Sequence, residues 1–370
     1  MDKCIIFVKQ VNKPICMDEK KKIIFIVNPI SGTQNKKLIL SLVEENIDRQ
    51  KYEFEIIKTE YAGHAVEIAA KAASDHVGIV VAIGGDGTIN EIARSLIHTP
   101  TALGIIPCGS GNGLARHLQI PLDIKGAIDV INEGNLSCID YGRINNYPFF
   151  CTCGVGFDAF VSLKFANSGK RGLLTYLENT LHESLNYKPE TYELENEDGT
   201  RKHKAFLIAC ANASQYGNNA YIAPQASLKD GLMDVTILEP FTVLDVPTLA
   251  FQLFNKTIDQ NSRIKTFKTK KIRITRSKPG VIHYDGDPVM TGENIEVEIF
   301  AKGLMVVVPD KKRKQNNVLQ KASDYINELS PISGSIMEDI TYKNRLLLDR
   351  NKALIKKLKE KRNSRDENNL

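Results

Sequence analysis

The segment GIVVAIGGDGTINEIARSLI, residues 78–97, decides the fold of this chain. Its first part, GIVVAIG (78–84), is a short apolar run bounded by turn residues, which is typical of a buried strand. Its last part, INEIARSLI (89–97), has apolar residues at helical spacing. Three glycines and the carboxylate of Asp86 lie around the junction. The segment therefore predicts a strand, a glycine-rich turn and a helix.

The same alternation of strand and helix extends from about residue 22 to residue 140. We expect further strands and helices, in chain order, at IIFIV (23–27), LILSLVEENI (38–47), FEIIKT (54–59), HAVEIAAKAA (64–73) and ALGIIP (102–107). Consecutive units of this kind favour a mostly parallel sheet covered by helices. In such sheets, ligands bind at the carboxyl ends of the strands, where the turns lie.

Beyond residue 140 the pattern changes to strands joined by short turns. The segments with this character are RINNYPFFCTCGVGF (143–157), TYELENEDGTRKHKAFLIACANA (191–213), LMDVTILEP (232–240), KKIRITRS (270–277), VIHYDGDPV (281–289) and NIEVEIF (294–300). NEDGT (196–200) is typical of a hairpin loop. Two segments with helical spacing interrupt the strands, GLLTYLENTLHESL (172–185) and VLDVPTLAFQLF (243–254). We therefore expect a mainly antiparallel β domain.

Composition and charge place the chain among globular cytoplasmic proteins. Hydrophobic residues make up 42% and charged residues 25%, and the formal net charge is only +5, which does not predict a nucleic-acid partner. No apolar run is long enough to span a bilayer, and the N-terminal one is too short for a signal peptide. Seven scattered cysteines without a C-x-x-C pair indicate reduced thiols rather than a disulfide framework or a zinc site.

Four turns of the first domain follow strands and are expected to gather at one edge of the sheet: NPISG (28–32), Thr59, GGDGTINE (84–91) and PCGSGNG (107–113). Glycine lets backbone N–H groups approach a polyphosphate, and a helix that follows adds partial positive charge. Asp86 suits such a site if Mg²⁺ lies between its carboxylate and the phosphates. The alternative is that the glycines only form tight strand–helix turns. Neither the P-loop spacing nor G-x-G-x-x-G is present.

NPISG, GGDGTINE, PCGSGNGLAR, LKDGLMD and YDGD occur in the order typical of the diacylglycerol kinase catalytic-domain family, which the chain resembles over residues 22–309. The likeness is strongest to soluble bacterial lipid kinases and to sphingosine kinases. It implies an α/β fold of two domains with the active site in the cleft between them. The first is a nucleotide-binding domain similar to NAD kinases and phosphofructokinases, and the second is an antiparallel β-sandwich.

The resemblance implies domain boundaries as well. The nucleotide-binding domain is expected at residues 22–140, completed by about 303–330, because LMVVVP (304–309) should return to it. The lipid-substrate domain is expected at 141–302 and a basic tail at 331–370.

The resemblance implies transfer of the γ-phosphoryl group of ATP to the hydroxyl of a membrane lipid, with ATP and Mg²⁺ as cofactors. The residues implied to contact ATP are Asn28, Pro29, Ile30, Ser31, Gly32, Thr59, Gly85, Asp86, Gly87, Thr88, Ile89, Asn90, Glu91 and Ser110. Asp86 is expected to reach the Mg²⁺ of the nucleotide, directly or through water.

SLKDGLMD (227–234) resembles the stretch that holds a second, structural Mg²⁺ in bacterial members of the family. The match implies Ser227, Asp230 and Leu232 as ligands. The alternative is a plain β-turn, because Asp-Gly is a common turn pair.

YDGD (284–287) resembles the D-G-E signature of the family, whose aspartate is the proposed general base. This implies Asp285, because a carboxylate near the acceptor hydroxyl can orient it and take its proton. The chain departs from the signature at Asp287, where glutamate is usual, so the role of Asp287 stays open. GVGFDAF (154–160) matches a glycine-rich turn of the family and is expected to line the cleft.

Three functions remain open at this point. A lipid kinase would act on diacylglycerol or a sphingoid base, and the serine of GSGNG is closer to the form common in sphingosine kinases. A kinase for a soluble metabolite, similar to NAD kinase, shares GGDGT. A non-catalytic lipid-binding relative is the third, although Asp86, Asp230 and Asp285 are all present.

The tail segment KNRLLLDRNKALIKKLKEKR (343–362) is basic and would be amphipathic as a helix. It could bind anionic headgroups at the inner membrane surface, where each Lys or Arg adds about 1 kcal/mol. The alternatives are a solvated helix or a helix that packs on a partner subunit, as in a homodimer.

Overall fold

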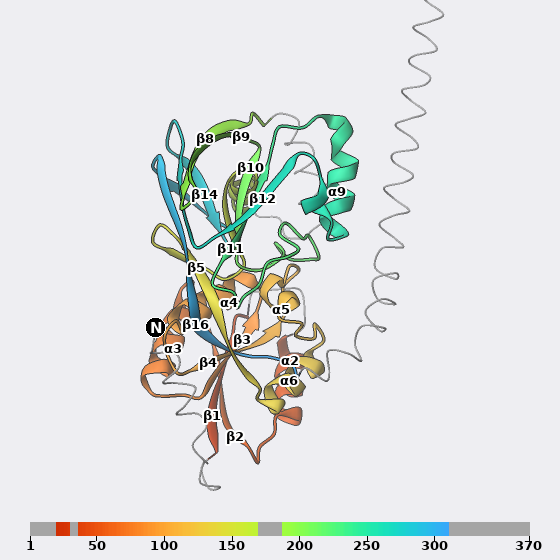
Figure 1. Cartoon of the computed structure of the whole chain (residues 1–370). Helices are drawn as coiled ribbons and strands as arrows, with labels where there is room; N and C mark the ends of the chain where they lie inside the picture. The colour runs from red at the N-terminus through yellow and green to blue at the C-terminus, as the bar shows by residue number, and fades with distance from the viewer. Residues whose placement is uncertain (1–19, 30–35, 169–186, 311–370) are drawn as a thin grey trace, which may run out of the picture. The chain divides into compact units, whose positions relative to one another are not determined.

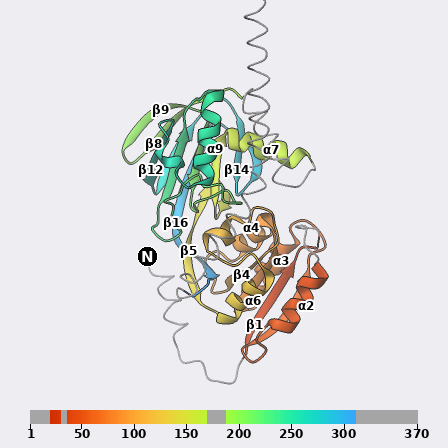
Figure 2. The same ribbon diagram turned by 90° about the vertical axis from the view of Figure 1, so that its right-hand side faces the viewer.

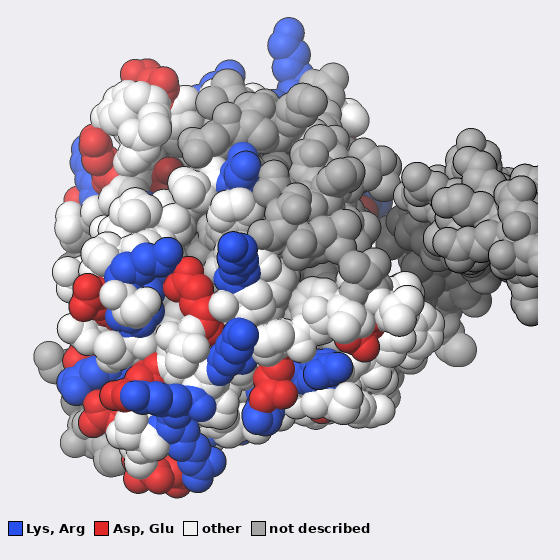
Figure 3. Space-filling view, turned by 90° about the horizontal axis from the view of Figure 1, so that it is seen from above, with Lys and Arg blue, Asp and Glu red and all other residues white. Residues whose placement is uncertain are grey.

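The computed structural model describes residues 20–29, 36–168 and 187–310 of the chain (Figure 1). The helix expected over 172–185, the loop residues Ile30, Ser31 and Gly32, and the tail from residue 311 lie outside the described residues. Within the described ranges, no helix is both long and apolar enough to cross a membrane. On the face that Figure 3 shows, basic and acidic side chains are interspersed over the described surface.

Four parallel strands run in the order β2–β1–β3–β4. Their bounds are Lys21–Val27 for β1, Tyr52–Lys58 for β2, Ile79–Gly84 for β3 and Ala102–Pro107 for β4. Every residue of β3 and β4 is buried, as expected of central strands in a parallel sheet. The apolar run 78–84 therefore forms a central strand, paired with β1 and β4.

Helices pack beside these strands and on one another. The bounds are Lys36–Asn46 for α2, His64–Ser74 for α3, Asp86–Ser95 for α4, Gly113–His117 for α5 and Ile124–Glu133 for α6. α2 contacts α6, and α3 contacts α4. α4 begins at Asp86 rather than at Ile89, because the N–H of Ile89 donates to the carbonyl of Gly85 (3.0 Å) and closes an earlier turn. Asp86 and Thr88 therefore lie in the first helical turn.

The second part of the chain is an antiparallel β-sandwich, which confirms the predicted fold class (Figure 2). One sheet has the order β12–β11–β10–β7–β14–β15, and the other continues the parallel sheet through β16–β13–β8–β9. Side chains of both sheets, such as Tyr192, Ile208 and Val297, form one buried cluster. The bounds are Leu136–Ile144 for β5, Tyr147–Phe149 for β6, Thr152–Gly156 for β7, Glu190–Asn196 for β8, Gly199–Ala205 for β9, Leu207–Ala211 for β10, Met233–Leu238 for β11, Ile264–Thr269 for β12, Lys271–Thr275 for β13, Gly280–Tyr284 for β14 and Asp287–Thr291 for β15.

One long strand, β16 (Asn294–Val307), belongs to both parts of the chain. Its first half pairs antiparallel with β13, and Val306 near its end pairs parallel with β4. β5 runs along it, with a shift of register between Phe300 and Leu304 that marks a bulge. The end of β16 thus lies beside the parallel strand β4.

Helices in the sandwich part include one that the sequence predicted. The helix expected over 243–254 is present as the short 3-10 turn η1 (Val243–Asp245) followed by α9 (Val246–Phe254). A further 3-10 turn, η2 (Ile258–Gln260), follows. GVGFDAF contains the junction between β7 and α7 (Phe157–Ser168), where Gly156 has a φ of +96°.

Candidate active site

The carboxyl ends of the four parallel strands meet at one edge of the sheet, as the sequence predicted. The N–H of Asn28, after β1, donates to a carbonyl of β3 (3.3 Å). The N–H of Thr59, after β2, donates to the last residue of β1 (2.9 Å), and that of Cys108, after β4, donates to the last residue of β3 (2.8 Å). The four turns therefore lie side by side, so that groups on them can reach a common ligand.

The turns after β3 and β4 are so close that side chains are excluded where they touch. A Cβ atom on Gly109 would lie 2.8 Å from the Cα atom of Gly85, and one on Gly111 would lie 2.8 Å from Oδ2 of Asp86. Both distances are shorter than real Cβ atoms tolerate. The glycines that the sequence assigned to phosphate binding therefore also allow the two turns to interlock.

Asp86 joins these two turns through its carboxylate. Its Oδ2 accepts the N–H of Asn112 (2.8 Å), and its Oδ1 accepts the N–H of Gly113 (2.7 Å) at the start of α5. Burial raises the pKa of Asp86, and the two hydrogen bonds oppose that shift. Each oxygen has a second lone pair, so the half-buried carboxylate can still face a cation. Asp86 thus has a structural task that the sequence did not predict, beside its predicted contact with Mg²⁺.

The surroundings of Asp86 fit a Mg²⁺ ion that arrives with a nucleotide. Among the residues that the structure describes, no group of three or more His, Cys, Asp and Glu side chains could hold a metal ion. Mg²⁺ usually keeps several waters and uses one or two carboxylates together with substrate phosphates. Asp86 would be the protein ligand in such an arrangement, and phosphate oxygens and water would supply the others.

The other residues expected at ATP differ in what they can offer a ligand. Asn28 donates from Nδ2 to Oγ1 of the buried Thr88 (3.2 Å), so these side chains support the turn. Gly87 and Ser110 are exposed, whereas Ile89 is buried in the core and can offer only its backbone. Pro29 and Gly85 are described, and Ile30, Ser31 and Gly32 are not.

Lys36, the first residue of α2, is a candidate that the sequence did not identify. Its Nζ atom is buried and has no oxygen or nitrogen atom as a hydrogen-bond partner among the described residues. The thiol of Cys108, a weak acceptor, lies beside it: burial raises the pKa of this thiol, and the charge of Lys36 and a weak hydrogen bond from it lower this pKa. Because Cys108 belongs to the turn after β4, this ammonium lies at the same edge of the sheet, with only a weak thiol acceptor beside it among the described residues. An anionic ligand would supply its partner.

Asp285, the expected general base, lies between β14 and β15 with a φ of +49°. Its Oδ1 accepts the N–H groups of Cys151 (2.8 Å) and Thr152 (3.0 Å). Its Oδ2 accepts the N–H of Phe150 (2.8 Å) and the side-chain amide of Asn90 (2.8 Å). Burial raises the pKa of Asp285, and these hydrogen bonds oppose the shift. Since a carboxylate has about four acceptor sites, this network engages all of them.

Asp86 and Asp285 influence the same buried thiol. Cys151 is 8% exposed, and burial raises its pKa far above the ordinary value, with further increases from the charges of Asp285 and Asp86. A Cβ atom on Gly113, whose N–H binds Asp86, would lie 3.4 Å from Sγ of Cys151, and the N–H of Cys151 itself binds Asp285, so both carboxylates lie near this residue. Asn90 of α4, the helix that Asp86 begins, binds Asp285 directly. The structure therefore brings the expected metal-binding carboxylate and the expected base together, although they are far apart in the sequence.

Asp287 faces charged residues of α4. Burial raises its pKa, and the charge of Arg94 lowers it. The pKa of Glu91 is raised by burial, lowered by Arg94 and raised by Asp287. The charge of Arg94 thus acts on two carboxylates, one from each part of the chain. Glu91, expected at ATP, is a half-buried residue of α4.

A buried polar cluster lies next to the Asp285 turn. Oδ2 of Asp158 in α7 lies 3.0 Å from Nε2 of His283 and accepts the hydroxyl of Tyr216 (3.2 Å). A Cβ atom on Gly154 would lie 2.6 Å from this Oδ2, so the first glycine of GVGFDAF makes room for the pair. Whether this stretch lines a cleft stays a prediction.

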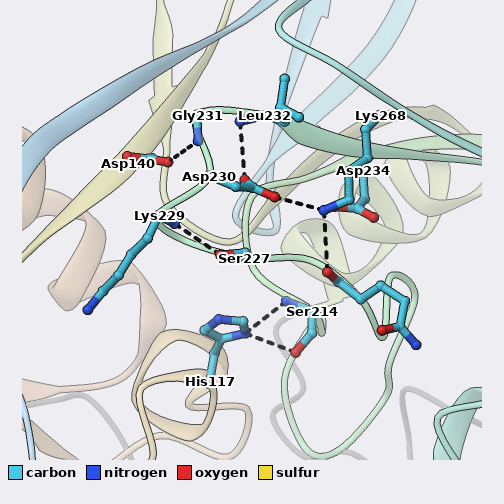
Figure 4. Close-up of polar contacts among 11 residues, drawn as sticks. His117, Asp140, Ser214, Ser227, Lys229, Asp230, Gly231, Leu232, Asp234 and Lys268 are labelled. Carbon is cyan, nitrogen blue, oxygen red and sulfur yellow. Dashed lines mark hydrogen bonds and ion pairs between the residues drawn. The ribbon is translucent and has the colours of Figure 1, made fainter.

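The expected ligands of the second Mg²⁺ lie in the turn before β11, but a lysine binds their carboxylate (Figure 4). Nζ of Lys268 lies 2.8 Å from Oδ2 of Asp230, and Oδ1 of Asp230 accepts the N–H of Leu232 (3.2 Å). Oγ of Ser227 accepts the N–H of Lys229 (3.3 Å). The three residues are thus brought together, with an ammonium group as the cation at Asp230.

Two family models match most of the described chain. Residues 22–144 match the family model of the diacylglycerol kinase catalytic domain. Residues 151–308 match that of the YegS C-terminal NAD kinase beta sandwich-like domain.

Two relatives show the extent of the similarity. A diacylglycerol kinase of Bacillus subtilis is 28% identical over 303 residues, which cover 80% of this chain and 99% of the relative. A diacylglycerol kinase of Staphylococcus epidermidis is 26% identical over 272 residues, which cover 72% of this chain and 86% of the relative. A crystal structure of a diacylglycerol kinase from Bacillus anthracis aligns with a TM-score of 0.61 at 18% identity, covering 80% of this chain and 98% of that one. At this identity the structural likeness shows the fold alone.

Proposed function

The chain belongs to the diacylglycerol kinase catalytic-domain family, and from this premise we propose that it transfers the γ-phosphoryl group of ATP to the hydroxyl of a membrane lipid. The observation that carries the proposal is the hydrogen bond between Asn90 and Asp285. It links the helix that starts at Asp86 with the sandwich turn that bears the expected base. A nucleotide on the first side and an acceptor on the second would meet at this link.

The nucleotide side is supported by three features of the sheet edge. The interlocked turns expose the glycine-rich backbone near Ser110, and the first turn of α4 adds the partial positive charge of a helix N-terminus. The ammonium of Lys36 is buried and has only the weak thiol acceptor of Cys108 beside it among the described residues, as expected for a group that binds phosphate. When bound, Mg²⁺ would neutralise charge on the phosphates next to Asp86.

On the acceptor side, Asp285 can receive a lipid hydroxyl only if one of its four donors moves. Three of the donors are backbone N–H groups of Phe150, Cys151 and Thr152, which are fixed by their place in the chain. The fourth, the amide of Asn90, is on a side chain and can rotate away or share Oδ2. We therefore place the acceptor hydroxyl where the Asn90 amide now lies.

In the proposed step, the lipid oxygen forms a bond to the γ-phosphorus while the bond to the bridging oxygen of ADP breaks. The hydroxyl proton passes to Asp285. Because transition states of phosphoryl transfer are loose, orientation of the hydroxyl should contribute more than base strength. A carboxylate held by three backbone N–H groups is suited to orientation, because its position is fixed before the substrate binds.

Diacylglycerol is our first candidate for the acceptor, since relatives that align over most of their length are named diacylglycerol kinases. A sphingoid base is the second candidate, because it also presents a primary hydroxyl beside an apolar tail. The serine that favoured it, Ser110, belongs to the turn that Asp86 holds, on the expected nucleotide side. It therefore gives no information on the acceptor.

A panel of acceptors tests the proposal. The full chain is incubated with Mg²⁺ and ATP labelled at the γ-phosphate, with vesicles that contain diacylglycerol, monoacylglycerol, sphingosine or dihydrosphingosine, and separately with NAD. We expect labelled lipid, most of it from diacylglycerol. Label on NAD alone would support a soluble-metabolite kinase, and ATP binding without any transfer would support a non-catalytic relative. Either result would overturn the proposal.

We propose that the basic tail brings the enzyme to the cytoplasmic surface of the membrane. Lys and Arg residues in 343–362 would attract anionic headgroups, and the apolar stripe would enter the interface. Deletion of residues 343–370 should weaken binding to anionic vesicles and leave transfer to a short-chain lipid unchanged. Equal vesicle binding by the shortened and full chains would contradict this role.

A further inference from the structure

We propose that the ammonium group of Lys268 takes the place of the second, structural Mg²⁺, so that the turn at residues 227–234 is closed without a metal ion. The resemblance to the family implied that Ser227, Asp230 and Leu232 hold this ion. The contacts around Asp230 disagree with that expectation.

Lys268 lies among oxygen atoms of the turn (Figure 4). Its Nζ is 2.8 Å from Oδ2 of Asp230, 3.1 Å from Oδ2 of Asp234 and 3.5 Å from the carbonyl oxygen of Gln225. Asp234 is only 8% exposed, so this carboxylate needs a positively charged partner. One ammonium group supplies it and also binds the turn.

The sheet fixes Lys268 in this position. β11 and β12 are antiparallel neighbours, and Asp234 lies directly opposite Lys268 in their register. Opposite charges at such cross-strand positions attract one another across a short distance that the backbone sets. The lysine is thus part of the sheet geometry, unlike a surface side chain that meets a carboxylate by chance.

The turn has further supports that need no cation. The N–H of Gly231 donates to Oδ2 of Asp140 (2.7 Å), and the N–H of Asp140 donates to the carbonyl of Leu228 (2.7 Å). Asp140 lies in β5 and is fully buried. The N–H of Leu232 binds Oδ1 of Asp230. Hydrogen bonds on both sides of Asp230 therefore hold the turn in shape.

A Mg²⁺ ion at Oδ2 of Asp230 would conflict with this arrangement. Mg²⁺ binds oxygen at about 2.0 Å, so it would lie next to an ammonium that is 2.8 Å from the same atom. Relief of the repulsion would require Lys268 to leave, and the nearly buried Asp234 would lose its partner. The oxygen donors suit a cation, but the chain already provides one.

Binding of Mn²⁺ in place of Mg²⁺ tests the proposal directly. The full chain without nucleotide is titrated with Mn²⁺, and free Mn²⁺ is measured by electron paramagnetic resonance. For Lys268→Met, which keeps the aliphatic stem, we expect one site that binds at least about tenfold more tightly than any site of the wild type. Asp230→Asn in the Lys268→Met background should remove that site. Lys265→Met is the matched control, because Lys265 is in the same strand and pairs with Glu239 instead.

A second measurement does not depend on a variant. The midpoint of thermal unfolding of the wild type should be the same in EDTA and in Mg²⁺ at matched ionic strength, since the turn needs no metal. A wild-type chain that binds one Mn²⁺ as tightly as Lys268→Met, or that loses stability in EDTA, would overturn the proposal. Neither measurement uses ATP or lipid, so the outcome is separate from that of the proposed kinase activity.

Discussion

Asp285 and Asp230 each precede a glycine in a turn, but their surroundings differ. Asp285 is half-buried, and its carboxylate accepts hydrogen bonds from Asn90 and from three consecutive backbone N–H groups. Asp230 is exposed, accepts one backbone N–H and pairs with Lys268. The first carboxylate links two parts of the chain at the candidate site, and the second closes a local turn. The dipeptide is the same, so the role of each aspartate comes from the groups that the fold places around it.

The largest difference is expected in stability. Asp285→Asn places an amide NH₂ group against backbone donors, so we expect a loss of about 3 kcal/mol in the free energy of unfolding. Asp230→Asn removes an exposed ion pair, which should cost about 0.5 kcal/mol. Urea unfolding of both variants measures the difference. Equal losses would mean that the hydrogen bonds around Asp285 contribute no more than a surface pair.

Asp86 resembles Asp285 in its use of backbone donors, and its substitution should affect the nucleotide side. Asp86→Asn can keep only one of the bonds to Asn112 and Gly113, so the turn after β4 should shift. A small shift of a binding group can lower kcat/KM on the order of 10²-fold. Initial rates over a range of ATP concentrations measure this. Asp75→Asn, at the exposed end of α3, is the control, and an equal effect there would contradict the assignment.

Two lysines extend the comparison, because Lys268 has two carboxylate partners, whereas Lys36 has only the weak thiol acceptor of Cys108 among the described residues. If phosphate is the missing partner, Lys36→Met should raise the KM for ATP about tenfold, which corresponds to one charge-assisted hydrogen bond. Lys37→Met, at the exposed neighbouring position, should leave the KM unchanged. A KM that does not change in Lys36→Met would remove this lysine from the nucleotide site.

The smallest expected effect concerns pH. Burial raises the pKa of Asp285, and the bond from Asn90 lowers it, so Asn90→Ala should raise this pKa further. If the ionised carboxylate is required, activity falls as pH decreases through the raised pKa. The acid limb of kcat/KM should then move to higher pH in Asn90→Ala. An acid limb at the wild-type position would show that Asp285 does not control it.

The raised pKa of Asp285 affects stability in the opposite direction to activity: as pH rises, activity should increase and stability should decrease. An acid whose pKa is higher in the folded state than in the unfolded state makes folding less favourable as pH rises through this range. The contribution of Asp285 to the free energy of unfolding should therefore decrease as pH rises toward the value at which activity appears. Unfolding curves at several pH values, compared with those of Asp285→Asn, isolate this contribution.

The sequence was sufficient to predict the sheet edge. Each apolar run ended in a turn, and parallel strands place such turns together at one edge, so the positions of Asn28, Thr59 and Asp86 followed. The start of α4 was placed three residues late, at Ile89 instead of Asp86. Glycine and aspartate are poor helix formers within a helix, but aspartate is favourable in a first turn, where it meets the positive end of the dipole.

The partners of the carboxylates could not be predicted. The link between Lys268 and Asp234 depends on the register of β11 and β12, which no local pattern specifies. The donors to Asp285 depend on the backbone of residues 150–152, and the burial of Lys36 depends on the path of the turn after β4. Each of these contacts joins residues that are distant in the sequence, so only the packed fold brings them together.

We infer that phosphate is transferred at the Asp285 turn. The direct measurement is transfer of labelled γ-phosphate to diacylglycerol in vesicles by the wild type and by Asp285→Asn, with ATP binding measured on the same samples below their unfolding transition. We predict that the variant still binds ATP and that its transfer rate falls on the order of 10³-fold. Transfer at close to the wild-type rate by a variant that binds ATP normally would contradict the claim.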